Sequence, residues 1–313
     1  MNKILFLYTD PSDKADLLLA SDAVKSVLRK FRKSAVISFF NIDLSPTCLS
    51  EVKKLLAERV SDSDAIMFCG KKKENNKETL LFKECFGIHS AEYFSSGKCI
   101  CYPISIHSAS VNESTLRETG LTDISAIEKA VKLATNSAAT KKELLLCTNS
   151  EKESDRIIYN EFENSMAYAR GFSVEHFDFD EMICVFAKKV PSYDVILTTY
   201  NNARILATHI NALNRFPVGY TVLHGDNVRI YKKEFLPYED FSNLPYASCL
   251  IACANMLENE LCFKNAGVQL RKAVTQTLEK CFYEARHDFQ KHLLIEINKP
   301  IRHRKVITNE GNN

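Results

Sequence analysis

Short apolar runs alternate with longer amphipathic segments along most of the chain. Apolar runs that predict strands lie at residues 3–8, 35–42, 65–69, 99–104, 143–147, 195–199 and 218–223. Segments with apolar residues at helical spacing lie at about 17–31, 50–60, 123–137, 154–169, 201–213, 245–257 and 266–286. This alternation predicts an α/β fold with a mainly parallel sheet covered by helices.

The composition is that of a globular protein with a sizeable core. The chain has 313 residues, of which 45% are hydrophobic and 26% charged, and its net charge is +2. That balance gives no reason to expect a nucleic-acid partner. No run approaches the roughly 20 apolar residues that cross a bilayer, and the first apolar run is too short for the core of a signal peptide. We therefore expect a cytoplasmic protein without a nucleic-acid or membrane partner.

The chain contains eleven cysteines, but none form a C-x-x-C pair. Most lie in apolar segments, which predicts reduced and buried thiols in a reducing compartment. Cys249 and Cys253 are one helical turn apart, so they are either metal ligands or core residues. Core packing is the favoured interpretation, because neither a second pair nor a nearby histidine accompanies them.

The loops that follow the strands lack the usual nucleotide-binding sequences. The loop at residues 9–14 reads TDPSDK, and the whole chain has nine glycines. There is no G-x-G-x-x-G cradle, no P-loop, no zinc signature and no G-x-S-x-G elbow. Because ligands of open α/β sheets bind beyond the carboxyl ends of the strands, the composition of these loops argues against a nucleotide site built from glycines.

Several segments are informative because of the order in which they occur. Residues 193–198 read YDVILT, preceded by Asp180 and followed by His224-Gly225 and by the sequence NLP at 243–245. The last of these opens a helix that contains Ala252, Ala254, Asn255, Met256 and Leu257. Earlier segments are DAIMFCG at 64–70 and CICYP at 99–103. In this order they resemble the isocitrate/isopropylmalate dehydrogenase family of β-decarboxylating dehydrogenases.

The resemblance implies a two-lobed fold with a discontinuous first domain. Residues 1–99 and 215–313 would form this dinucleotide-side domain, and residues 100–214 the second. The second domain would be shortened, because residues 120–123 leave no room for the β arm that knits the family's dimer together. The resemblance also implies NAD(P) and a Mg²⁺ or Mn²⁺ ion, which polarises a 2-hydroxy acid before hydride transfer and loss of CO₂.

When the family's motifs are matched to this sequence, most of the family's catalytic side chains are absent from the matching positions. The two aspartates of the metal-binding helix fall on Arg204 and Thr208, and the proton-transferring lysine falls on Thr148. A guanidinium has no acceptor atom and repels a cation. The remnants are Asp180, which matches the metal ligand given across the dimer, and Arg117, which matches a substrate-binding arginine.

Each remnant has a second interpretation. Asp180 is either a remnant ligand or, as we favour, the N-cap of the next helix. Arg117 either binds a carboxylate or lies on the surface. His224 and Gly225 either support an adenine ring or end a strand in a turn. Arg204 and Asp180 are candidates for an ion pair that replaces the metal.

Three hypotheses for function follow. The missing side chains favour a catalytically impaired homologue that serves as a regulatory, scaffolding or ligand-binding subunit and binds no cofactor tightly. Its expected assembly is a homodimer, or a heteromer with an active paralogue. The alternatives are an active but divergent NAD(P)-dependent oxidoreductase acting on a 2-hydroxy acid, and an unrelated α/β protein whose motifs match by chance. Whether the chain is an enzyme stays open on the sequence alone.

Overall fold

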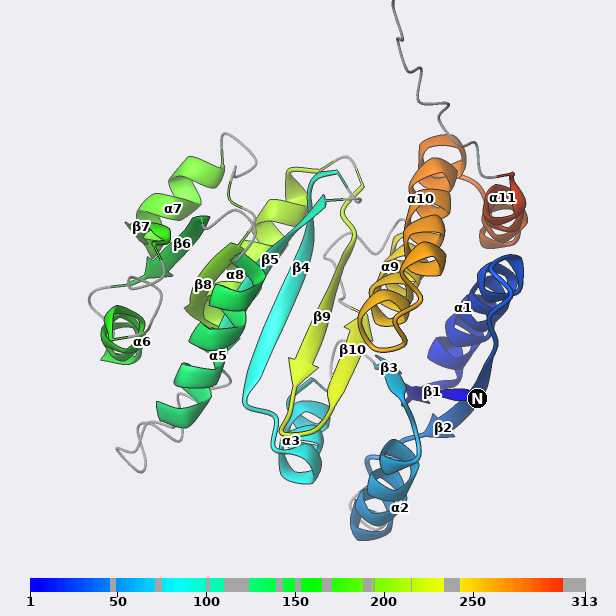
Figure 1. The fold of residues 1–313 in the computed structure, drawn as a ribbon, viewed down its shortest axis with the longest axis horizontal. Coiled ribbons are helices and arrows are strands. Elements are labelled where there is room, and N and C mark those ends of the chain that lie inside the picture. Colours follow the sequence, from blue (N-terminus) through cyan, green and yellow to red (C-terminus); the bar gives the residue numbers. More distant parts are fainter. Residues whose placement is uncertain are drawn as a thin grey trace, which may run out of the picture.

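One sheet of ten strands runs through the molecule (Figure 1). A computed structural model describes residues 1–45, 49–70, 75–99, 102–109, 124–138, 143–149, 153–164, 171–187, 193, 195–214, 216–233 and 243–300. The strands are β1 (Asn2–Tyr8), β2 (Ala35–Asn41), β3 (Ala65–Cys69), β4 (Ser90–Cys99), β5 (Tyr102–Ala109), β6 (Glu143–Thr148), β7 (Ser173–Asp178), β8 (Val195–Thr199), β9 (Gly219–His224) and β10 (Arg229–Lys233). Their order in the sheet is β2-β1-β3-β10-β9-β4-β5-β8-β6-β7.

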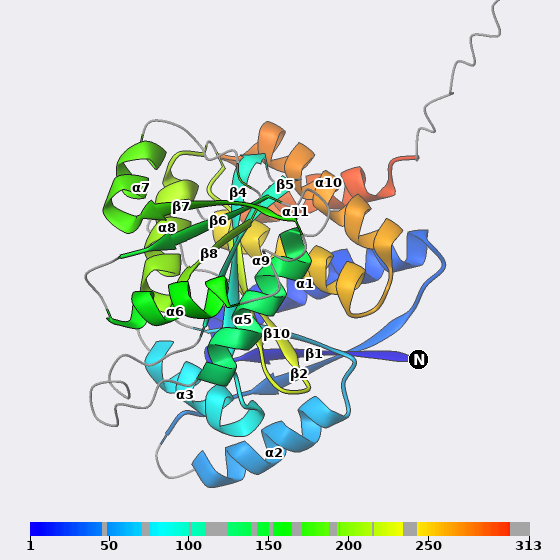
Figure 2. The same ribbon diagram turned by 60° about the vertical axis from the view of Figure 1, so that its left-hand side comes forward.

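Helices cover both faces of the sheet. They are α1 (Pro11–Lys30), α2 (Leu49–Ser61), α3 (Asn75–Phe86), α5 (Ile124–Ser137), α6 (Glu153–Glu163), α7 (Phe179–Phe186), α8 (Tyr200–Ala212), α9 (Leu244–Asn259), α10 (Lys264–Cys281) and α11 (Arg286–Asn298). One face carries two separate apolar cores, under α1, α9, α10 and α11 and under α5 and α6. The other face packs on α2, α3, α7 and α8. Figure 2 shows α1 and α2 on opposite sides of β1 and β2.

The sequence explains where the first helix begins and why α9 lies deepest. The side chain of Asp10 accepts a hydrogen bond from the Ser12 N–H, and Pro11 occupies the first turn of α1, where its missing N–H has no cost. Helix α9 is apolar around most of its circumference, and all but three of its residues are buried. A helix of this composition is stable only inside a core.

The middle of the sheet departs from the parallel arrangement. Strand β10 pairs in parallel with β3, but β10 with β9, β9 with β4, and β4 with β5 are antiparallel. The remaining strand pairs are parallel. The prediction of an α/β fold with a mainly parallel, helix-covered sheet is therefore confirmed. The division into domains at 1–99 plus 215–313 and 100–214 stays a prediction.

Some predicted elements are wrong in their bounds. The segment 99–104 is not one strand, because it spans the connection between β4 and β5. No helix was predicted at residues 75–86, which form α3. The helix predicted at 266–286 ends at Cys281, and α11 begins at Arg286. Strands β4, β7 and β10 were not predicted. Their polar residues break the apolar pattern, and sheet pairing with distant segments stabilises them instead.

The cysteine prediction is confirmed for five thiols, which are buried and free. These are Cys69, Cys147, Cys249, Cys253 and Cys281. The Sγ atoms of Cys69 and Cys249 lie 4.0 Å apart. Cys249 and Cys253 are both fully buried in the apolar core, which agrees with the packing role that we favoured. None of the helices in the described part of the chain has both the length and the apolar character needed to cross a membrane.

Candidate functional site

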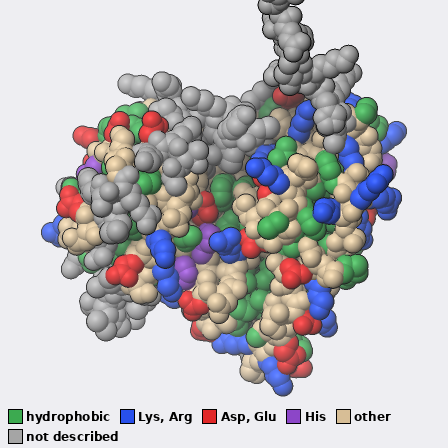
Figure 3. Space-filling view, viewed as in Figure 1, with side chains coloured by type: hydrophobic (Ala, Val, Ile, Leu, Met, Phe, Trp, Pro, Cys, Tyr) green, Lys and Arg blue, Asp and Glu red, His purple; other side chains and the backbone are tan. Residues whose placement is uncertain are grey.

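A cleft of about 510 Å³ lies between the two apolar cores on one face of the sheet. Figure 3 shows histidine side chains gathered in the hollow near the centre of this view. The described lining residues are Glu92, Phe94, Ser105, Leu133, Asn136, Ser137, Val195, Val222, His224, Arg229, Tyr231, Asn255 and Asn259. They come from α5, α9 and the strands between these helices, so the cleft is built by segments far apart in the sequence.

Strand alternation brings the polar residues of the cleft together. In β4, Glu92 points to the cleft while its neighbours Ala91 and Tyr93 enter the core of the opposite face. The sheet register places Glu92 directly opposite His107 of β5. Ser105 lies two residues before His107, on the same side of the strand. His224 ends β9, the other neighbour of β4.

Glu92 is the centre of this polar cluster. Its Oε1 accepts a hydrogen bond from the Ser105 hydroxyl at 2.5 Å and lies 3.3 Å from the Nε2 of His107. Its Oε2 lies 3.3 Å from the Nε2 of His224. The side chain of Glu92 is 12% exposed, and that of His107 is 2% exposed. The carboxylate therefore forms the floor of the cleft, whereas His107 lies beneath it.

The cluster keeps Glu92 ionised. Burial opposes its ionisation, but contacts with His107, His224 and Ser105 outweigh this effect and lower the pKa of Glu92 below its usual value. Burial also lowers the pKa of His107, despite the nearby carboxylate. His107 is therefore neutral at pH 7. The hydroxyl of Ser105 has one hydrogen, which it donates to Glu92. The oxygen of Ser105 therefore accepts a hydrogen bond from the Nε2–H of His107, and this bond stabilises the cluster.

The arrangement is suited to binding rather than to nucleophilic catalysis. In a Ser-His-acid triad the histidine uses one ring nitrogen for the serine and the other for the acid. Here Ser105 and Glu92 both face the same nitrogen of His107, with Ser105 at 2.8 Å. Ser105 also contacts the acid directly. A proton therefore cannot be relayed from the serine through this ring to Glu92.

We expect His107 to make the fold less stable as the pH falls below 6.5. The folded state holds His107 neutral, because its pKa is lowered from 6.5, whereas the unfolded chain takes up the proton. Each proton bound only by the unfolded chain lowers the free energy of unfolding by about 1.4 kcal/mol per pH unit. Urea unfolding between about pH 7 and pH 5 should give a shallower pH dependence for His107→Gln. An equal slope in both proteins would contradict this assignment.

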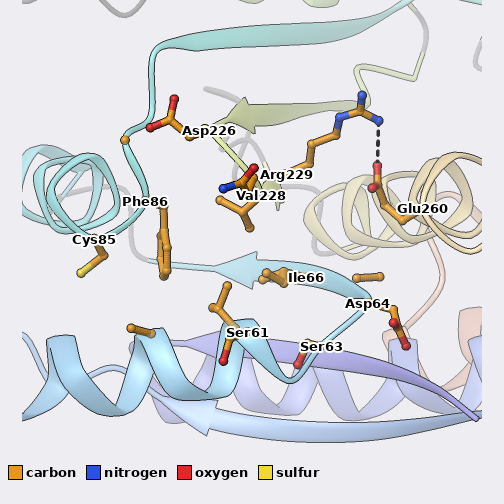
Figure 4. A pocket seen from close by; sticks show the side chains of 15 residues that line it. Ser61, Ser63, Asp64, Ile66, Cys85, Phe86, Asp226, Val228, Arg229 and Glu260 are labelled. Atoms are coloured by element: carbon orange, nitrogen blue, oxygen red, sulfur yellow. Dashed lines mark hydrogen bonds and ion pairs between the residues drawn. The ribbon is translucent and has the colours of Figure 1, made fainter.

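A second hollow of about 630 Å³ lies at the amino ends of β3 and β10 (Figure 4). Its charged groups are already paired with other protein groups. Arg229 contacts Glu260 at 3.2 Å, Lys129 contacts Asp226 at 3.0 Å, and Asp64 accepts from the Lys3 N–H at 2.7 Å. Figure 4 shows Arg229 turned toward Glu260. This hollow is larger than the cleft, but the charged side chains among its described lining residues are paired with other protein groups, so the cleft is the stronger candidate.

A buried ionic cluster lies at the carboxyl end of β10. The Nζ of Lys233 is 3.2 Å from Asp13 and 3.5 Å from Asp16, and Arg286 also contacts Asp16. Burial disfavours the charged lysine, but nearby acidic groups, first Cys69 and then Asp13 and Asp16, outweigh that effect and raise the pKa of Lys233. The Lys233 side chain is 3% exposed. The cluster therefore joins α1, β10 and α11 rather than facing a ligand.

The predicted remnants do not gather into a metal site among the described residues. Asp180 is exposed in the first turn of α7 and is not the N-cap, which corrects that prediction. Asp178 caps the helix instead and accepts the Asp180 N–H at 3.0 Å. Arg204 is also exposed, and no ion pair between Arg204 and Asp180 is found. Arg117 lies outside the described residues, as does the segment at 120–123.

The other family positions carry groups that are engaged elsewhere. The hydroxyl of Thr208 donates to the Arg204 carbonyl of its own helix at 2.9 Å. The hydroxyl of Thr148 lies 2.7 Å from the Nε2 of His176. The residues at these positions do not fit a Mg²⁺ or Mn²⁺ ion, which requires several oxygen ligands. Asp10 caps α1 with a carboxylate, which disfavours a cofactor phosphate at that helix end.

His224 ends β9 and Gly225 begins the turn to β10, as the second of our two interpretations predicts. The Gly225 N–H donates to the Val228 carbonyl at 2.9 Å. A Cβ atom at Gly225 would lie 2.5 Å from the Phe86 carbonyl oxygen, so this close approach requires glycine. Along the sequence, strand β10 lies between this turn and helix α9. His224 is nevertheless part of the cleft, through Glu92 rather than through a nucleotide loop.

Sequence reasoning missed Glu92, Ser105 and His107. A signal for two of them was present, because Ser105 and His107 alternate with Ile104 and Ile106. Alternation of this kind places two polar side chains on one face of a strand. No local signal points to Glu92, whose partners lie in other strands. Comparison with protein-family models gives no match for the chain, and comparison with curated proteins gives none either.

Proposed function

We propose that the chain is a catalytically impaired homologue of the NAD(P)- and metal-dependent isocitrate/isopropylmalate dehydrogenases, acting as a ligand-binding subunit with a regulatory or scaffolding role. Its ligand would bind in the cleft above Glu92. The observation that carries the proposal is a largely buried, ionised carboxylate on the floor of an open cleft. Such a group has a desolvation cost that a bound ligand partner would offset.

The topology supports the relationship to this family. Strands β5 to β8 lie together at one end of the sheet. The chain then returns toward the other end as β9 and β10, and β10 pairs with β3. This return is what a discontinuous first domain predicts. The exposed Arg204 and Thr208 on α8 support the loss of metal-dependent catalysis.

The charge of the cleft favours a ligand that is neutral or cationic. Arg229 is the one arginine or lysine among the described residues that line it, and its guanidinium is paired with Glu260. A substrate with two or three carboxylates requires several free cations. Glu92 Oε2 has one partner among the described residues, His224, and a carboxylate oxygen accepts about two hydrogen bonds. The expected ligand therefore presents hydroxyl or amine donors to Glu92.

Thermal unfolding of the purified chain with chosen probes tests this proposal. The probes are adenosine, inositol and spermidine, and the acids for comparison are isocitrate and 3-isopropylmalate with Mn²⁺. We expect at least one neutral or cationic probe to raise the melting temperature, because a ligand that binds only the folded state stabilises it. Glu92→Gln, which keeps the volume but removes the charge, should abolish that increase. Glu58→Gln, at an exposed position on α2, is the matched control.

We also expect no reduction of NAD⁺ or NADP⁺ with either acid. Loss of the metal ligands and the proton-transferring lysine removes several kcal/mol of transition-state stabilisation, and each 1.36 kcal/mol is about tenfold in rate. Absorbance of the reduced cofactor is the measurement. Saturable cofactor reduction, or stabilisation by the acids alone, would reject the proposal and favour a divergent oxidoreductase.

A further inference from the structure

Three side chains that carry different metal-binding groups, a thiol, a carboxylate and an imidazole, lie close together at the connection between α10 and α11. They are Cys281, the last residue of α10, Glu284 in the turn, and His292 in α11. One ligand atom from each lies within 4.8 Å of the others. Cys281 is buried, whereas Glu284 and His292 are exposed. We propose that this Cys-Glu-His group is a binding site for Zn²⁺, independent of the cleft.

The separation of His292 and Glu284 fits a shared ion better than direct contact, and the Cys281 thiol hydrogen-bonds to Glu284. His292 Nε2 and Glu284 Oε2 are 3.6 Å apart, which is too long for a good hydrogen bond. Two ligands held at about 2.0 Å by a tetrahedral Zn²⁺ lie about 3.3 Å from each other. Small rotations of the exposed Glu284 and His292 side chains would therefore complete the site. A water molecule would be the fourth ligand, as in other three-residue zinc sites.

The chemistry of the group selects the metal. A thiolate and an imidazole favour Zn²⁺ over Mg²⁺ or Ca²⁺, which prefer oxygen ligands. The site also lies at the carboxyl end of α10, where the partial negative charge of the helix attracts a cation. Two basic side chains that lie close to the group in the sequence are engaged elsewhere. Lys280 pairs with Glu296 at 2.5 Å, and Arg286 pairs with Asp16.

Cobalt substitution tests the site on the full chain. Addition of Co²⁺ to the purified, metal-free protein should give a thiolate-to-cobalt charge-transfer band and visible bands of a four-coordinate ion. Zn²⁺ should abolish both by displacement, with one ion bound per chain. Removing a residue that hydrogen-bonds to a metal ligand lowers the affinity for the metal about 10- to 100-fold. Removing a ligand itself should therefore lower this affinity at least about 100-fold.

Two variants and a control distinguish the site from other thiols. Cys281→Ser and His292→Ala should each abolish the cobalt spectrum, and His292→Ala alters an exposed side chain that is not needed for packing. Cys262→Ser replaces an exposed cysteine outside the group and should keep the spectrum. Absence of a charge-transfer band in the unmodified protein, or its persistence in His292→Ala, would overturn the proposal. These readouts do not depend on ligand binding in the cleft.

Discussion

We expect Lys233→Met to lower the free energy of unfolding by about 3–5 kcal/mol, the usual cost of removing one partner from a buried ion pair. Methionine keeps much of the volume but leaves Asp13 without its cation. The side chains of Asp13 and Asp16 are only 7% and 9% exposed. Arg286 still contacts Asp16 in the variant, so the uncompensated charge would be that of Asp13.

Urea unfolding followed by circular dichroism is the measurement. Lys25→Met, at an exposed position on α1, is the control and should change stability by less than about 0.5 kcal/mol. Adding Asp13→Asn to Lys233→Met should recover part of the loss, because the unpaired charge is then removed. If Lys233→Met is as stable as the control, the buried ion pair does not have the role we assign to it.

The second large effect is expected for Glu92→Ala. The substitution removes the acceptor of hydrogen bonds from Ser105 and His224 and the carboxylate that lies 3.3 Å from the Nε2 of His107. Hydrogen bonds to a charged group contribute about 1.5–3 kcal/mol each, but water entering the cleft will replace some of them. We therefore expect a loss of about 3 kcal/mol in the free energy of unfolding.

Glu58→Ala, on the exposed side of α2, is the matched control for this measurement. The comparison also separates stability from binding, because Glu92→Gln should lose less stability than Glu92→Ala and yet lose the response to a ligand. A Glu92→Ala protein that unfolds like Glu58→Ala would show that solvent fully replaces the contacts of Glu92.

The fold class was predictable because its cause is local. Strand β3 is buried on both faces and consists of continuous apolar residues, strand β8 begins with three of them, and the helices between the strands have a regular apolar spacing. Strand β4 could not be found in this way. It contains Ser95, Ser96 and Gly97, and it is a strand because β9 and β5 pair with it on either side.

The candidate site was predictable only in part, for a related reason. His224 was identified from a motif, but its role in the cleft depends on Glu92, far away in the sequence. Lys233 was missed because it ends a short strand of mixed composition and meets Asp13 only in the folded sheet. Ionised groups that are buried by distant segments leave no periodic pattern in the sequence.

The position of β10 has a consequence for the order in which the protein can fold during synthesis. Strands β1, β2 and β3 are made first and can pair with one another, but the outer edge of β3 stays open until residues 229–233 have been made. An apolar strand with an open edge readily pairs with other chains. The contacts that close it are distant in sequence, and such contacts form slowly. The open edge of β3 therefore leaves the emerging N-terminal half prone to aggregation until β10 has been made.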